Sequence, residues 1–181
     1  MQPDSGGGFF DNQEDLIAAI GRSVGPEAAE AARRSLQLSR NPRPLTDAER
    51  AELRATLEPV LRDLRSSGAI VPDIVEEAHD DDDDGPDCVC AWIQTPGGAG
   101  SRGISVLVNL PAPERLAGLA DQLQEWEVEE LAAAGRPATW PECPLHPGTH
   151  PLAPEVRGDQ ATWCCPASGQ AISAIGALAP Q

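Results

Sequence analysis

The last forty or so residues concentrate metal-ligating side chains, and this feature constrains the fold more than any other. Between residues 140 and 178 lie two of the three histidines and three of the five cysteines. Cys143 and His146 are separated by two residues, so that a tight turn can bring both to one ion. Zinc takes thiolate and imidazole ligands in tetrahedral geometry. The segment is therefore predicted to fold around one Zn²⁺ per chain, with Cys143, His146 and Cys165 as the core ligands.

The sequence leaves the fourth ligand open among three alternatives. A second turn would offer a ligand three residues after Cys165, but Ser168 stands there. His150 is the first choice and gives the spacing Cys-x2-His-x3-His-x14-Cys. Cys164 is the second choice, although adjacent side chains on a strand point to opposite faces. Water is the third and would leave the site open. The predicted ligand set is Cys143, His146, His150 and Cys165.

The wider text of this segment carries a resemblance. It reads Trp-Pro-x-Cys-Pro-x-His-Pro-x-x-His-Pro-Leu from Trp140, followed by Trp-x-Cys-Pro from Trp163. The pattern resembles a zinc ribbon, in which two knuckles clamp one ion between short hairpins. It is also similar to a set of uncharacterised proteins from high-GC bacteria that end in such a segment after a long acidic helix. The resemblance implies a zinc-ribbon-like module and no particular activity.

Hydrophobic periodicity predicts four helices, near residues 12–21, 26–39, 46–67 and 112–134. Thr46 and Glu49 form a capping-box pattern at the start of the third helix. Pro59 lies inside the same pattern and predicts a kink. Gly68 and Gly135 stand where helix C-terminal caps belong.

Alternating hydrophobicity predicts strands near 88–95 and 104–110, joined as a β-hairpin by a glycine-rich turn. A second hairpin is predicted near 161–165 and 170–176, and residues 69–75 fit either a strand or a short helix. The predicted fold class is α+β, with N-terminal helices and a long helix on a small antiparallel sheet, followed by the zinc-ribbon-like module. The predicted parts are a disordered start (1–11), an α+β domain (12–135) with an acidic linker (76–87), and the module (136–181). A chain truncated after Gly135 is expected to stay folded.

The charge balance limits the partners. The formal net charge is −16 and the isoelectric point is near 4.4. Phosphate binding requires a dense basic surface, so nucleic acid and anionic membranes are excluded as expected partners. A protein with a basic surface is favoured instead. The start lacks a signal-peptide pattern, and no apolar run approaches a membrane span. The protein is therefore expected in the cytoplasm, with reduced cysteines.

These observations favour a small zinc-binding protein with a structural metal site that acts in protein–protein interaction or regulation. One alternative is a zinc-dependent hydrolase with an open metal site, in which Glu142 or Glu155 would be the general base. Another is a thiol redox sensor, working through Cys164 and Cys165 or through zinc release. Cys88 and Cys90 are interpreted as small buried hydrophobic residues.

Overall fold

The computed structural model describes residues 22–23, 25–27, 43–75, 77–78, 88–97 and 100–180. The chain divides into two compact units, residues 1–42 and residues 43–181. The disordered start (1–11), the helix near 12–21, and almost all of the helix near 26–39 and of the acidic linker lie outside the described residues. The domain boundary between residues 135 and 136 stays a prediction.

Within residues 43–181, the described part holds two helices, α3 (Asp47–Ser66) and α4 (Ala112–Ala133), and three small antiparallel sheets. The first sheet pairs β1 (Arg43–Pro44) with β3 (Glu77–Ala78). The second has the order β2-β4-β5, with β2 (Asp73–Val75), β4 (Cys88–Gln94) and β5 (Ser101–Leu107). The third has the order β6-β7-β8, with β6 (Ala153–Arg157), β7 (Gln160–Cys164) and β8 (Ala171–Ala174). The predicted α+β class is confirmed.

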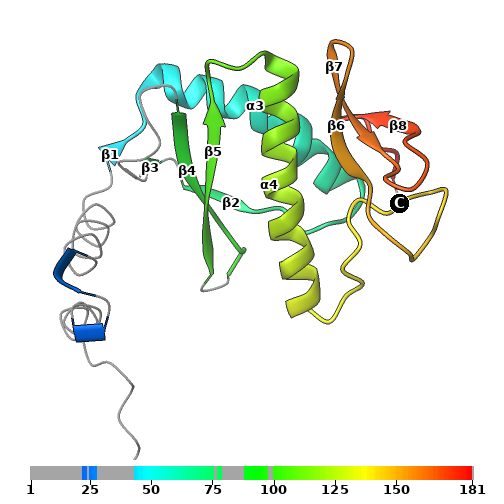
Figure 1. The fold of residues 1–181 in the computed structure, drawn as a ribbon, viewed down its shortest axis with the longest axis horizontal. Helices are drawn as coiled ribbons and strands as arrows, with labels where there is room; N and C mark the ends of the chain where they lie inside the picture. The colour runs from blue at the N-terminus through cyan, green and yellow to red at the C-terminus, as the bar shows by residue number, and fades with distance from the viewer. Residues whose placement is uncertain are drawn as a thin grey trace, which may run out of the picture. The chain divides into compact units, whose positions relative to one another are not determined.

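Helix α4 lies between the two three-stranded sheets and also packs against α3 (Figure 1). Both helices begin and end close to the predicted positions. At the start of α3 the capping box is formed, because the Thr46 amide donates to the Glu49 carboxylate at 2.7 Å and the Glu49 amide donates to the Thr46 hydroxyl at 3.3 Å. Helix α3 runs through Pro59 without interruption to Ser66. Gly135 follows α4 and has φ +68°. This is the left-handed backbone conformation in which many α-helices end.

The β4–β5 hairpin forms as predicted, although β5 begins at Ser101 and not at residue 104, because Ser101 and Arg102 pair with Gln94 and Ile93. The segment for which strand and helix were both open contains strand β2. The β7–β8 hairpin also agrees with the prediction. Strand β6 was not predicted, since its Pro154 interrupts a strand pattern. It is the outer strand of its sheet, where a proline is tolerated.

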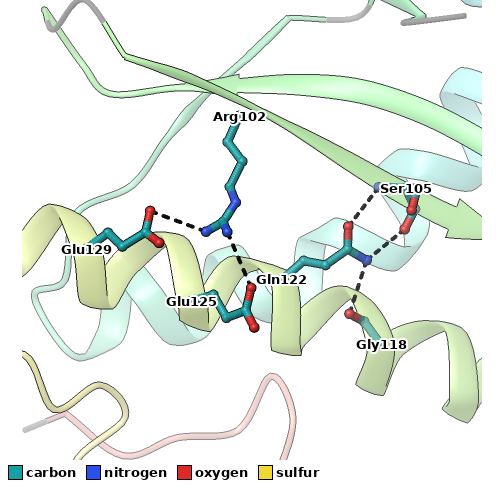
Figure 2. A network of polar contacts seen from close by, with 6 residues as sticks. All are labelled: Arg102, Ser105, Gly118, Gln122, Glu125 and Glu129. Atoms are coloured by element: carbon teal, nitrogen blue, oxygen red, sulfur yellow. Dashed lines mark hydrogen bonds and ion pairs between the residues drawn. The ribbon is translucent and has the colours of Figure 1, made fainter. Parts of the chain in front are cut away.

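One side chain of α4 completes the outer edge of β5 (Figure 2). The Gln122 side chain accepts a hydrogen bond from the Ser105 amide at 2.9 Å and donates one to the Ser105 carbonyl at 3.0 Å. Nearby, Arg102 forms ion pairs with Glu125 at 3.4 Å and Glu129 at 3.5 Å. Solvent-exposed ion pairs contribute at most about 1 kcal/mol each. The glutamine is thus the more specific link, because it occupies backbone groups that another strand would otherwise pair with.

The hydrophobic core is continuous from the helices into the C-terminal segment. Its buried members come from α3, β4, β5, α4 and the residues after 139, and include Leu53, Leu57, Ile93, Ile104, Leu123, Trp126, Trp140, Leu152 and Trp163. Truncation after Gly135 would expose this core to water. Contrary to the expectation from the sequence, the truncated chain should therefore lose its cooperative thermal unfolding transition, which circular dichroism measures.

Gly176 lets the C-terminal loop approach α3 closely. It has φ +93°, and a Cβ atom there would lie 2.8 Å from Cβ and 3.1 Å from Cα of Pro59. We expect Gly176→Ala to lower the free energy of unfolding by about 2–3 kcal/mol, because strain in φ and a clash with backbone add together. Chemical denaturation measures this change.

Gly118 on α4 provides the matched control. No atom lies within 4 Å of a Cβ built there, and its φ is not positive. Gly118→Ala should therefore raise the free energy of unfolding by about 0.5–1 kcal/mol. If both substitutions changed stability equally, close packing at Gly176 would not be the cause.

Glu127 of α4 is a buried carboxyl group. It accepts a hydrogen bond from the Ile70 amide at 2.9 Å, while its second oxygen has no hydrogen-bond partner. Burial raises its pKa from 4.5 to about 7, and the nearby charge of Glu130 adds to this rise, whereas the Ile70 amide and Arg136 oppose it. Because the folded pKa is above the unfolded value, stability falls as the pH rises from 4.5 to about 7.

Replacing this carboxyl group should remove that pH dependence. We expect Glu127→Gln to be more stable than the parent protein at pH 8 by about 1–3 kcal/mol, with a smaller difference near pH 4.5. Denaturation of both proteins across this range provides the measurement, and the exposed Glu114→Gln serves as control. A constant difference between parent and variant at every pH would contradict the assignment.

Candidate metal centre

The first half of the centre is a loop closed by backbone contacts. Glu142 and Pro151 form an isolated antiparallel bridge, and the Leu152 amide donates to the Pro141 carbonyl at 2.7 Å. Between these ends the chain turns tightly, with the His146 amide 3.1 Å from the Cys143 carbonyl oxygen. The loop therefore holds three of the predicted ligands, Cys143, His146 and His150, within one short hairpin.

Two side-chain hydrogen bonds stabilise the loop that carries Cys143, His146 and His150. Gly148 has φ +69°, and its amide donates to the Glu142 carboxylate at 2.8 Å. The Thr149 hydroxyl donates to the His146 carbonyl at 2.6 Å. These bonds restrict the loop between the two histidines.

The second half is the turn between β7 and β8. Cys165 directly follows β7, and its carbonyl accepts a hydrogen bond from the Gly169 amide at 2.8 Å. The Cys165 amide donates in turn to the Gln170 carbonyl at 2.9 Å. Gly169 has φ +70°, which a side chain would disfavour. The turn resembles a knuckle and brings the Cys165 sulfur opposite the first loop.

The four predicted ligands converge in space. Their ligand atoms all lie within 4.8 Å of one another, and this group can hold a metal ion. The His146 Nδ1 atom lies 3.7 Å from Cys143 Sγ, 3.4 Å from Cys165 Sγ and 3.2 Å from His150 Nε2. The His150 Nε2 atom lies 3.9 Å from Cys165 Sγ.

These separations can be compared with the edges of a coordination tetrahedron. Zinc binds sulfur at about 2.3 Å and imidazole nitrogen at about 2.05 Å, so the edges should be about 3.6 Å for sulfur to nitrogen and about 3.3 Å for nitrogen to nitrogen. The measured separations are 3.4–3.9 Å and 3.2 Å. Four of the six edges thus match a zinc tetrahedron, and the other two, from Cys143 Sγ to Cys165 Sγ and to His150 Nε2, are within 4.8 Å.

A backbone contact orients the ring of His150. The His150 Nδ1 atom lies 2.8 Å from the Pro151 carbonyl oxygen. A carbonyl only accepts hydrogen bonds, so Nδ1 is the donor in this contact, and in the neutral ring Nε2 then offers its lone pair to the centre. Metal-binding histidines commonly have such an outer partner.

The surroundings of the Cys165 thiol lower its pKa. Its pKa is lowered to about 6, chiefly by a hydrogen bond with the Ser168 side chain. The amides of Ser168 and Ala167 and the side chain of Cys143 lower the pKa further, against the effect of burial. Ser168 occupies the position where a ligand was expected, and it instead forms a hydrogen bond that lowers the pKa of Cys165. The lowered pKa favours the thiolate, which is the form that binds metal.

The other candidates lie elsewhere. Cys164 is fully buried and does not belong to the four-residue group. It lies on β7 opposite Ala153 of β6. The two proposed general bases are engaged in other contacts. Glu142 accepts from Gly148, and Glu155 lies 2.6 Å from Arg157.

Two tryptophans anchor the centre to the helices. The rings of Trp140 and Trp163 meet edge to face, with centroids 5.5 Å apart. Trp163 donates to Asp63 at 2.7 Å, and Trp140 donates to Ser67 at 2.8 Å. The Gln124 side chain also donates to the Trp140 carbonyl at 2.9 Å.

Sequence reasoning missed these polar partners. Asp63 is completely buried in α3, and its carboxylate also accepts hydrogen bonds from the Gly176 and Leu178 amides at 2.7 and 2.9 Å. Its partners are at least 100 positions away along the chain. No pattern in the neighbouring sequence distinguishes this buried aspartate from the exposed ones.

In comparisons with known proteins, no protein-family model, no curated protein and no solved structure matches the chain. The centre must therefore be interpreted from its own geometry. Among the helices of the described residues, none has the length and apolar character needed to cross a membrane.

Proposed function

We propose that this protein binds one structural Zn²⁺ through Cys143, His146, His150 and Cys165 in a zinc-ribbon-like module, and acts in protein–protein interaction or regulation. The agreement between the four interatomic separations and the edges of a zinc tetrahedron carries the proposal. Two thiolates and two neutral imidazoles would also balance the charge of the ion.

A structural role is preferred over hydrolysis because four protein ligands would close the site. Structural zinc sites have four protein ligands, whereas catalytic sites keep a position for water. With His150 in the group, four protein ligands are available. Both candidate bases have other partners, Gly148 for Glu142 and Arg157 for Glu155.

The proposed partner is a protein with a basic surface, because the chain has a net charge of −16. Exposed carboxylates at Asp121, Glu125 and Glu129 line one side of α4. A cytoplasmic location belongs to the same proposal, since thiolate ligands persist in a reducing compartment. Nucleic acid and membranes are not proposed as partners.

Elemental analysis of the purified chain tests the metal. We expect one zinc per chain in the parent protein and in Cys90→Ser, and none in Cys143→Ser. Replacement by Co²⁺ should give the strong visible absorption of a tetrahedral thiolate site. Zinc in the Cys143→Ser protein, or a cobalt spectrum of an octahedral site, would refute the proposed ligand set. An exchangeable water on the metal would favour the hydrolase alternative.

The partner is tested separately by capture from the native host at increasing salt. Binding that depends on complementary charge should weaken steeply as ionic strength rises. Salt-independent capture, or capture of nucleic acid, would contradict a basic protein partner.

A further inference from the structure

A second pair of sulfur atoms lies outside the metal centre, on β4. Cys88 and Cys90 stand two positions apart on this strand, and their Sγ atoms are 3.1 Å apart. Val89 between them points into the core and is buried. We propose that Cys88 and Cys90 form a reversible redox pair, a dithiol that peroxide converts to a disulfide. This inference does not depend on the zinc proposal.

The geometry allows the bond but strains it. A disulfide requires a sulfur separation of about 2.05 Å, so the two atoms must approach by about 1 Å. Alternate Cα atoms on an extended strand are about 6.6 Å apart. This value is near the upper limit for disulfides, and a disulfide under strain is readily reduced. The pair is therefore suited to a reversible switch and not to a permanent crosslink.

Exposure assigns different roles to the two thiols. Cys88 is half-buried, whereas Cys90 is 5% exposed. The Cys88 thiolate attacks one oxygen of hydrogen peroxide, and the O–O bond breaks to give a Cys88 sulfenic acid and hydroxide. The Cys90 thiol then attacks the Cys88 sulfur, the S–S bond forms, and water leaves. The two thiols are oxidised by two electrons, and one peroxide becomes two waters.

A metal site is the competing use of two close thiols. Among the residues that the structure describes, no third His, Cys, Asp or Glu joins this pair to make a metal-binding group. Two thiolates alone leave a tetrahedral ion incomplete. The redox use needs only the two thiols that the structure places 3.1 Å apart.

The chain allows a direct test, because trypsin cleaves after Arg65 and Arg102 and releases Cys88 and Cys90 in one peptide without the other three cysteines. The full-length protein is treated with one equivalent of hydrogen peroxide, alkylated and digested. We expect this peptide to lose two hydrogen atoms in mass, to escape alkylation, and to recover both thiols after dithiothreitol. The zinc content, measured in parallel, should not change.

Two variants complete the experiment. Cys88→Ser should abolish formation of the disulfide, whereas Cys164→Ser should leave it intact. Full alkylation of both thiols after peroxide, or oxidation at Cys88 that stops at sulfinic acid, would overturn the inference. So would zinc that stays with Cys143→Ser but is lost on adding Cys88→Ser, since that result would make the pair a metal ligand.

Discussion

Cys165→Ser is expected to lose zinc and to unfold the C-terminal segment. The substitution removes one of the four proposed ligands, the one whose thiol pKa is lowered. We expect zinc affinity to fall at least about a thousandfold, roughly 4 kcal/mol. In small zinc modules metal binding free energy is folding free energy, so the melting temperature should fall as well. Competition with a chromogenic chelator measures the affinity, and calorimetry measures the melting temperature.

Cys164→Ser is the matched control, because Cys164 is the adjacent residue and equally buried but lies outside the metal-binding group. It should retain one zinc per chain. A chelator added to the parent protein should reproduce the loss of stability seen in Cys165→Ser. Should Cys164→Ser release zinc as readily as Cys165→Ser, the choice of His150 as fourth ligand would have to be abandoned.

Asp63→Asn is expected to be the most damaging substitution outside the metal centre. Three N–H groups converge on this buried carboxylate, from Trp163, Gly176 and Leu178. An amide of the same shape replaces one accepting oxygen with a donor, so that at least one N–H must face another N–H. We expect the free energy of unfolding to fall by about 3 kcal/mol. Denaturation followed by tryptophan fluorescence provides the measurement.

The exposed Asp121→Asn on α4 makes the same chemical change without these partners, and its effect should stay within about 0.5 kcal/mol. The zinc content of Asp63→Asn, measured after refolding, separates the anchor from the ligands. Equal stability of the two variants would mean that the buried hydrogen bonds of Asp63 contribute little to the free energy of unfolding.

Short-range patterns were sufficient for much of the fold. Thr46 and Glu49 are three positions apart, and their capping box depends only on that spacing. Alternation along β4 was equally local. Strand β6 escaped prediction because its stability comes from pairing with β7, and Pro154 weakens the local pattern. The core shared by the helices and the C-terminal segment is equally non-local, since it joins residues that are distant in sequence.

The candidate ligands could be chosen from the sequence because few thiol and imidazole groups are available, and their spacing limits which of them can reach one ion. The sequence alone thus determined which residues are candidate ligands, the acidic character of the chain and its helical and strand patterns. Only the tertiary structure decided that His150, and not Cys164, groups with the other three candidate ligands, and that Asp63 joins this segment to α3. Both outcomes depend on side-chain direction after distant segments have packed together, which no local spacing specifies.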